Sequence, residues 1–428
     1  MSPIAPEKQL ETSPSGPPSG AGAPHPLVRT PDEWRQALVA LGERPFRAMQ
    51  VFQWIHRRNV YDAREMTDLP AALRDKLVDD GLVAPLDVRL ERRSLDDTRK
   101  LLVGFPDGAT VETVLIPAVS GPGSPAAGGG QEARPLEAEA DADAASADTD
   151  EPEADDPGSG YGVEGARRRV TQCISTQVGC AMGCVFCASG VAGLKRHLGA
   201  HEIVGQVLEG RRRLDDHEAL RNVVFMGMGE PLHNYDATAR ALHILTRDDG
   251  IGLSKRRVTV STSGLVPEID RLGRDFAGQI TLAISLHATT DERRSALMPI
   301  NRKYPLAELM ASLRRYPLPK RRRITIEYTL VAGQNDSPAE ARALHALLRN
   351  LPVKINLIPM NPIEASSLGP PELSGVLAFQ RVLLDAGHSC FVRRRRGEDV
   401  DAACGQLALL GAAPRKKRLP FAREPHEG

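Results

Sequence analysis

The chain has 428 residues, of which 41% are hydrophobic, and this length leaves room for two or more domains with buried cores. No apolar run approaches the roughly 18 residues of a membrane span. The N-terminus also lacks the basic start and apolar stretch of a signal peptide, so we expect a cytoplasmic protein. Six cysteines, four of them between 173 and 187, do not resemble a secreted disulfide framework and favour a metal or redox role.

The net charge of zero conceals an uneven distribution of charge. Residues 118–165 hold twelve acidic residues against Arg134 alone, so the rest of the chain has a net charge of +11. Its basic residues form six clusters, at 167–169, 211–213, 255–257, 320–323, 393–396 and 415–418. One such cluster is typical of a solvated helix end, but six on a net basic body indicate a polyanionic partner, most simply a nucleic acid.

The first part of the chain predicts a tail, a small helical module and a short β extension. Residues 1–27 are rich in Pro, Gly and Ser, which predicts a disordered tail. Thr30 is a capping residue before Pro31, and apolar positions then recur at helical spacing. Further elements are expected in the span 28–117, namely a helix over 69–81 and strands over 86–92, 99–105 and 110–117.

Residues 118–165 form a low-complexity acidic segment with almost no aliphatic content beyond alanine. Such a segment cannot bury enough apolar surface to offset the entropy of ordering it, so we expect a disordered insertion. Because the entropy of loop closure grows only logarithmically with length, the fold should tolerate it.

From residue 166 onward, strand patterns alternate with helical ones. Strands are expected over 169–178, 222–228, 257–264, 279–287, 324–331, 353–361 and 389–396. Helices are expected over 200–214, 235–247, 306–316, 337–350 and 370–387. This alternation predicts parallel βαβ units, and six or seven of them suit a partial (β/α) barrel better than an open doubly wound sheet. In a barrel the site lies at the carboxyl ends of the strands.

Three cysteines with the spacing CxxxCxxC follow the first of these strands, at Cys180, Cys184 and Cys187. A structural zinc site needs a fourth ligand, which here would be Cys173 or His197. The other interpretation is an iron–sulfur cluster whose open iron binds a substrate or cofactor. The spacing resembles that of the radical S-adenosylmethionine (SAM) superfamily, in which the open iron chelates the amino and carboxylate groups of SAM.

Polar residues also end the next three predicted strands. The stretch "MGMGEP" ends the second strand, where glycines allow a ligand to approach closely and Glu230 is a candidate partner of an ammonium group. A simple strand-to-helix turn is the alternative. Ser261, Ser285 and His287 end the third and fourth strands and are candidates for contact with a ribose or a carboxylate, although a lone histidine there is more often structural.

Over about residues 30–407, apart from the acidic insertion, the chain resembles the RlmN/Cfr family of radical SAM RNA methyltransferases. The motifs that carry the resemblance include "CISTQVGCAMGCVFC", "FMGMGEPLHNYD", "GLSKRRVTVSTSGLVP", "KINLIPMNP" and "RGEDVDAACGQL". The stretch "RPFRAMQVFQWIH" resembles the accessory domain of that family. The resemblance implies an α/β fold with a partial (β/α)6 radical SAM barrel over 166–400 and a C-terminal segment over 401–428.

The resemblance also implies roles for individual residues. Cys180, Cys184 and Cys187 would hold a [4Fe-4S] cluster. The residues expected to contact SAM are Gly229, Glu230, Ser261, Ser285, Leu286, His287 and Asn361. Cys404 would carry a methyl group, Cys173 would form a disulfide with it to release the product, and Glu112 would accept a proton. Cys390 matches no functional cysteine, and we expect it to be buried packing.

The implied activity is methylation of adenine C2 in 23S rRNA, at the peptidyl transferase centre, and of the adenosine 3′ of the anticodon in some tRNAs. Because C2 is electrophilic, one SAM would methylate Cys404 and a radical from a second SAM would activate that methyl group. The implied partners are the two RNAs and an electron donor such as flavodoxin or ferredoxin, with the enzyme a monomer. Two alternatives are methylation of adenine C8, as in Cfr-type enzymes, and a non-catalytic zinc-stabilised RNA-binding protein.

Overall fold

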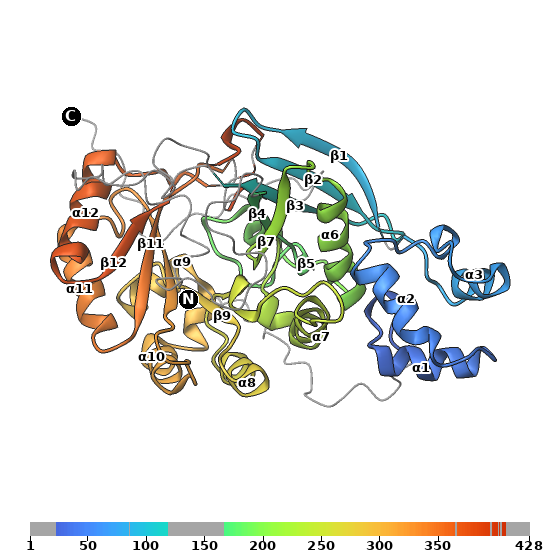
Figure 1. The fold of residues 1–428 in the computed structure, drawn as a ribbon. Coiled ribbons are helices and arrows are strands. Elements are labelled where there is room, and N and C mark those ends of the chain that lie inside the picture. The colour runs from blue at the N-terminus through green and yellow to red at the C-terminus, as the bar shows by residue number, and fades with distance from the viewer. Residues whose placement is uncertain are drawn as a thin grey trace, which may run out of the picture.

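The computed structural model describes residues 23–84, 86–118, 167–363, 366–393, 396–400, 402 and 405–407. These residues form a ten-stranded sheet with the order β1-β2-β3-β4-β7-β8-β9-β10-β11-β12 (Figure 1). Most of the predicted tail, nearly all of the acidic insertion, Cys404 and the C-terminal basic tail lie outside the described residues.

Seven strands of the sheet are parallel and follow one another in chain order. They are β4 (Arg168–Cys173), β7 (Glu218–Phe225), β8 (Val258–Thr262), β9 (Thr281–Ser285), β10 (Ile324–Leu330), β11 (Val353–Pro359) and β12 (Ser389–Val392). The helices between them are α6 (Ala200–Arg212), α7 (Tyr235–Leu245), α8 (Val266–Phe276), α9 (Asp291–Leu297), α10 (Leu306–Arg315), α11 (Pro338–Leu348) and α12 (Leu373–Asp385). Within the described residues β4 and β12 do not pair with each other, which confirms a partial barrel of βαβ units.

An antiparallel extension continues the sheet beyond β4. It consists of β1 (Asp87–Arg93), β2 (Arg99–Gly104) and β3 (Thr110–Pro117), and β3 pairs with β4. At the edge of this pairing the backbone N–H of Ala118 donates to the Arg169 carbonyl at 2.8 Å. The acidic insertion therefore leaves and re-enters the fold on neighbouring strands.

The N-terminal module contains helices α1 (Pro31–Ala40), α2 (Arg47–His56) and α3 (Ala71–Asp79). Thr30 caps α1 as predicted. Its hydroxyl accepts from the Glu33 backbone N–H at 3.3 Å, and the Glu33 carboxylate accepts from the Thr30 N–H at 2.7 Å. No helix in the described part of the chain is long and apolar enough to cross a membrane.

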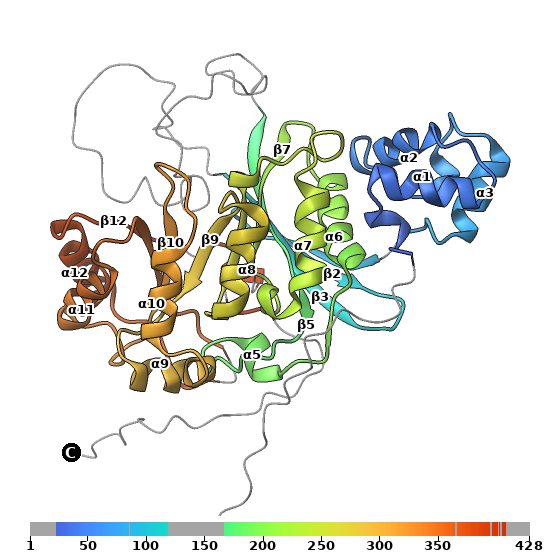
Figure 2. The same cartoon turned by 90° about the horizontal axis from the view of Figure 1, so that it is seen from below.

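Hydrogen bonds to backbone carbonyls attach this module to the outside of the barrel. Arg240 on α7 donates to the Val28 carbonyl at 2.7 Å, and the Asn59 side chain donates to the Leu208 carbonyl of α6 at 3.0 Å. Figures 1 and 2 both show the module beside α6 and α7, at the end of the molecule away from β12. It therefore extends the protein beyond the first two barrel helices.

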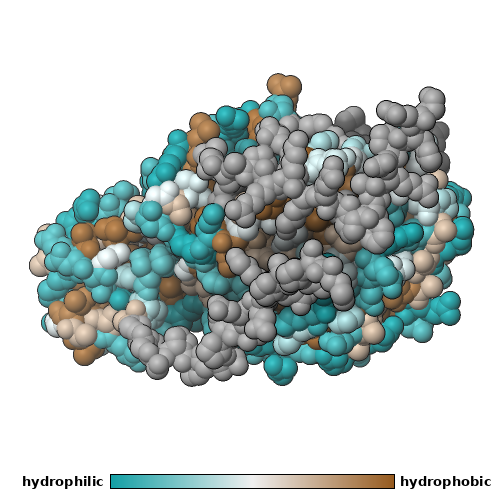
Figure 3. All heavy atoms as spheres, turned by 180° about the vertical axis from the view of Figure 1, so that it is seen from behind, coloured by the Kyte–Doolittle hydropathy of each residue, from teal (hydrophilic) through white to brown (hydrophobic). Residues whose placement is uncertain are grey.

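Some of the predicted basic clusters contribute to structural contacts. Arg168 pairs with Asp97 at 2.9 Å, and Arg396 pairs with Asp96 at 2.8 Å. On the face in Figure 3 hydrophilic residues predominate at both ends of the molecule, outside the grey residues. The basic clusters therefore stabilise the fold in part, and only some of their charge is available to a polyanion.

Deletion of residues 120–163, with the ends joined by a short Gly/Ser linker, should leave the fold intact. The reason is that the ends of the segment are already held side by side by β3 and β4. We expect a melting temperature within a few degrees of that of the full chain, measured by circular dichroism. A large loss of stability would show that the insertion packs on the fold.

Candidate functional site

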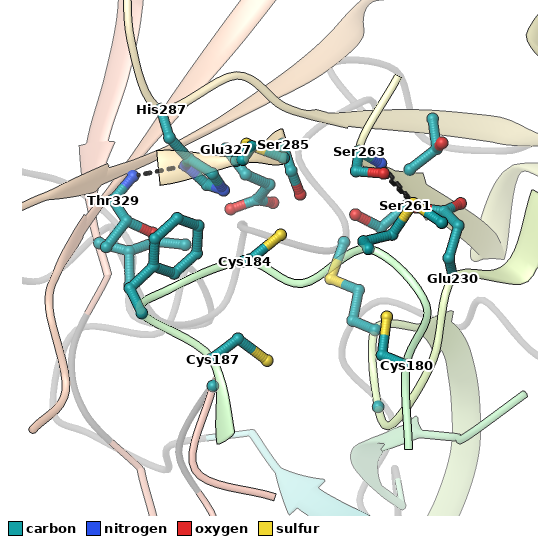
Figure 4. A pocket seen from close by; sticks show the side chains of 18 of the residues that line it. Cys180, Cys184, Cys187, Glu230, Ser261, Ser263, Ser285, His287, Glu327 and Thr329 are labelled. Carbon is teal, nitrogen blue, oxygen red and sulfur yellow. Dashed lines mark hydrogen bonds between the residues drawn. The ribbon is translucent and has the colours of Figure 1, made fainter. Parts of the chain in front are cut away.

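A pocket lies at the carboxyl ends of the parallel strands, where a barrel site is expected (Figure 4). Cys180, Cys184 and Cys187 line it from the loop before α5 (Ala188–Ala192). The polar side chains that line the rest of the pocket come from strand ends and the turns after them. They include Glu230, Ser261, Ser263, Ser285, His287, Glu327, Thr329 and Asn361.

Cys180 is buried, Cys184 and Cys187 are half-buried, and the three thiols are close enough to influence one another. Burial raises the pKa of the Cys184 thiol to about 12, and the neighbouring Cys187 raises it too. Burial also raises the pKa of Cys180, with further contributions from Cys184 and Cys187. Three thiolates would therefore form together here only beside a cation that offsets their desolvation and mutual repulsion.

The donor set of the pocket bears on the two metal centres that the sequence left open. Three thiols line the pocket, whereas Cys173 and His197, the candidates for a fourth zinc ligand, do not. Three thiolates suit an iron–sulfur cluster with one open iron better than a structural zinc site.

The turn after β7 approaches the loop that precedes the cysteines. Gly229 has a φ of +106°, and a Cβ there would lie 2.6 Å from the Cβ of Gln177, so only glycine fits. The Gln177 side-chain oxygen accepts from the Glu230 N–H at 2.9 Å. Its amide nitrogen lies 3.1 Å from Nδ1 of both His197 and His233. Gln177 thus fixes the backbone at the predicted glycine position.

Glu230 lines the pocket, and its carboxylate is already hydrogen-bonded. It accepts from the backbone N–H and hydroxyl of Ser263 at 2.7 and 2.8 Å and from the Leu232 N–H at 3.1 Å. Burial raises the pKa of Glu230, while the bonds from Ser263 lower it. An ammonium group bound here would share this carboxylate with Ser263.

His287 is held as a neutral side chain. Its Nδ1 accepts from the Thr329 N–H at 2.9 Å, and burial lowers its pKa to about 3. The proton of the neutral ring is therefore on Nε2, which is left as a hydrogen-bond donor. Ser285 lines the pocket beside it, whereas the Leu286 side chain is fully buried and does not.

The sequence analysis missed Arg294, a fully buried residue of α9 that connects two strand ends. Its guanidinium donates to the carbonyls of Ser263 at 2.6 Å, Ser285 at 3.0 Å and Leu286 at 3.0 Å. It also donates to the Asn301 side chain at 2.9 Å. Nothing in the charged run "DERRSAL" distinguishes this arginine from those exposed on a helix surface.

Glu327 of β10 is a second pocket residue that the analysis missed. In the sheet it pairs with Ser285 on one side and with Asn356 on the other. One carboxylate oxygen accepts from the Asn356 amide at 3.0 Å, and the other has no hydrogen-bond partner among the described residues. The sequence did contain a signal for this residue, because Glu327 is an acidic residue within an apolar strand pattern.

Glu112 and Cys173 are 61 residues apart in the sequence but lie on neighbouring strands. Val114 of β3 is directly opposite Cys173 of β4, and Glu112 lies two residues along β3 on the same face. Neither side chain lines the cysteine pocket. Cys404 lies outside the described residues, but Gly405 lines the pocket and its carbonyl accepts from the Ala188 N–H at 2.9 Å.

Cys390, expected to be buried packing, lies on β12 in the hydrophobic core and is 3% exposed. Burial raises the pKa of its thiol to about 12. Gln380 of α12 donates to its backbone carbonyl at 2.9 Å, and the thiol does not line the pocket. The expectation is confirmed.

Comparison with protein families matches two segments of the chain. Residues 174–344 match the radical SAM superfamily, and residues 30–82 match the ribosomal RNA large subunit methyltransferase N-terminal domain. The first segment spans the cysteine loop and strands β7 to β10, which bear much of the pocket, and the second spans the helical module. Radical SAM proteins use a [4Fe-4S] cluster and SAM, which agrees with the cofactors expected from the cysteine spacing.

Individual relatives match nearly the whole chain. The dual-specificity RNA methyltransferase RlmN of Sorangium cellulosum is 69% identical over 92% of this chain and 98% of its own length. The RlmN of Marinobacter nauticus is 42% identical over 86% of this chain and 88% of its own. The crystal structure of a radical SAM methyltransferase from Sphaerobacter thermophilus superposes with a TM-score of 0.75 at 40% identity, covering 89% of this chain and 98% of that one. The protein described here therefore belongs to the RlmN family of radical SAM RNA methyltransferases.

Proposed function

We propose that this enzyme methylates C2 of adenosine in 23S rRNA and in tRNA. The observation that carries the proposal is the position of Glu112 and Cys173 on one face of two neighbouring strands, despite the insertion between them. The relatives named RlmN are described as dual-specificity RNA methyltransferases, which supports two classes of RNA substrate. Methylation of C8 is the competing outcome.

The cysteine pocket would hold the two cofactors. Cys180, Cys184 and Cys187 would ligate the [4Fe-4S] cluster, and SAM would bind beside it. Together these groups supply a methyl donor and, after reduction of the cluster, a radical that activates a methyl group. The strand-end side chains would contact SAM, with Nε2–H of His287 as one donor.

The remaining steps are assigned to Cys404, Glu112 and Cys173. Cys404 would carry the methyl group to the adenine. Glu112 would accept the proton from C2, and Cys173 would form a disulfide with Cys404 to free the product. Gly405 supports this role for Cys404, since Gly405 lines the pocket and follows Cys404 directly in the sequence.

Mass spectrometry of the modified nucleoside tests the proposal. Purified enzyme, reconstituted anaerobically with iron, sulfide, SAM and a reductant, is incubated with unmodified 23S rRNA fragments and tRNA. We expect 2-methyladenosine in both. Exclusive formation of 8-methyladenosine would replace the proposed reaction with that of Cfr-type enzymes, and absence of any methyladenosine would refute it.

Cys184→Ala should lose the cluster and all cleavage of SAM, because two thiolates would remain where three are needed. Iron content and production of 5′-deoxyadenosine are the measurements. Cys390→Ala is the matched control, since it removes a buried thiol away from the pocket and should retain wild-type iron. Wild-type iron in Cys184→Ala would contradict the ligand assignment.

Cys404→Ala and Cys173→Ala should fail at different stages. The first should bind the cluster but give no methylated RNA. The second should stall after transfer, with RNA covalently attached to Cys404, because release needs the disulfide. Denaturing gels and mass spectrometry of tryptic peptides separate the two outcomes. Normal turnover in either variant would contradict the proposed roles.

Deletion of 120–163 should leave RNA affinity at low salt equal or higher, because eleven acidic residues and Arg134, a net charge of −10, are removed from a protein that binds a polyanion. Any difference should shrink as salt rises. Fluorescence anisotropy with labelled tRNA over a salt series measures it. If the deleted protein keeps its iron but loses activity, the insertion contributes directly to function.

A further inference from the structure

Lys100 of β2 forms an ion pair with Glu112 of β3. Its Nζ lies 3.0 Å from the Glu112 Oε1, and each side chain is 11% exposed. Lys100 is directly opposite Val114, which is directly opposite Cys173 on β4. Because opposite residues share a face, three adjacent strands present Lys100, Glu112 and Cys173 on one side of the sheet.

The backbone beneath Glu112 is fixed by the turn and the loop that lead into the cysteine pocket. The Ser175 hydroxyl donates to the Glu112 carbonyl at 2.6 Å, and the Glu112 N–H lies 3.4 Å from the Met228 sulfur. Leu101, the residue that follows Lys100 on β2, is fully buried, so the strand that bears the lysine is anchored in the core. These contacts hold the backbone of Glu112, so Lys100 acts on the orientation of the Glu112 carboxylate.

We propose that Lys100 is a positioning residue for the RNA-methylation step, which holds the Glu112 carboxylate in the orientation needed to accept the proton. The inference rests on the proposed function of Glu112. In that step the C2–H bond breaks, the proton passes to a Glu112 carboxylate oxygen, and the electron pair of the bond stays in the purine ring. The ion pair with Lys100 fixes where that carboxylate lies, so loss of the ammonium group should slow the step.

The expected magnitude follows from the cost of misplacing a group that takes part in the reaction. A displacement of about 1 Å can lower the rate about 100-fold. Without the ammonium group the Glu112 carboxylate can turn away from its place beside Lys100, so the proton-transfer step should slow.

The test compares the rates of single-turnover methylation for the wild type, Lys100→Met, Lys100→Gln and Lys100→Arg. The two neutral variants should be slower by about tenfold to 100-fold. Lys100→Arg should restore most of the rate. RNA deuterated at adenine C2 should react more slowly than normal RNA with Lys100→Met, because proton transfer then limits the rate.

Arg93→Met on β1 is the matched control for the loss of one positive charge. Arg93 pairs with Asp97 at the surface, and its side chain is 49% exposed. Both Arg93→Met and Lys100→Met should weaken RNA binding slightly in a salt-dependent way, but only the latter should slow the step and show the isotope effect. Iron content and melting temperature establish that each variant is folded.

Two patterns of result separate this inference from the proposed function. If Glu112→Gln is inactive while the neutral Lys100 variants keep the wild-type rate, Lys100 has no role in the step and the inference is wrong. If Glu112→Gln turns over normally, the assignment of Glu112 as the proton acceptor is wrong. Equal impairment of Lys100→Arg and Lys100→Met would also overturn the inference, since charge would then not explain the effect.

Discussion

The crowding of three thiols in one pocket is the constraint on which the rest of the site depends. Burial and the neighbouring thiols raise the pKa values of Cys180 and Cys184, so these two bind as thiolates only together with a cation. Arg294 is the buried positive side chain whose charge favours the Cys184 thiolate. Because the guanidinium of Arg294 is buried away from water, hydrogen bonds to strand-end carbonyls stabilise its charge instead. The charge of Arg294 thus links the loop that bears the three cysteines to the ends of β8 and β9.

The polar side chains that face this pocket are held by hydrogen bonds between neighbouring strands. Ser263 at the end of β8 fixes the Glu230 carboxylate, and the backbone of Thr329 on β10 fixes His287. Such bonds orient the side chains before a ligand arrives, which lowers the cost of binding. The antiparallel extension brings Glu112 beside Cys173 in the same way. The sheet therefore connects a cofactor pocket with a second group of reactive side chains.

Local sequence patterns predicted much of this arrangement. The cap at Thr30, the three short strands before the insertion and the alternation after it were all recognisable from periodicity and turn residues. Helix α8 was missed, although its apolar residues recur at helical spacing, because Pro267 and Gly273 interrupt an 11-residue segment. The cysteine spacing predicted the cofactors, and polar residues at strand ends predicted part of the pocket lining, including Glu230, Ser261, Ser285 and His287.

Other features could not be predicted because they depend on tertiary packing. Arg294 becomes a structural residue only because α9 lies beneath two strand ends, and the same charged run on an exposed helix would be a solvated surface. Leu286 matched a ligand-contacting position in the family, but its side chain turns into the core. The pairing of Lys100 with Glu112 depends on the register between β2 and β3, which alternation alone does not fix.

The most direct test of this account is metal analysis of the protein purified without oxygen. The spacing of the cysteines and the family to which the chain belongs predict a brown protein with about four irons and as many sulfides, absorbing near 400 nm. Reduction should bleach that absorbance. A colourless protein that holds one zinc ion per chain and no iron would contradict the account.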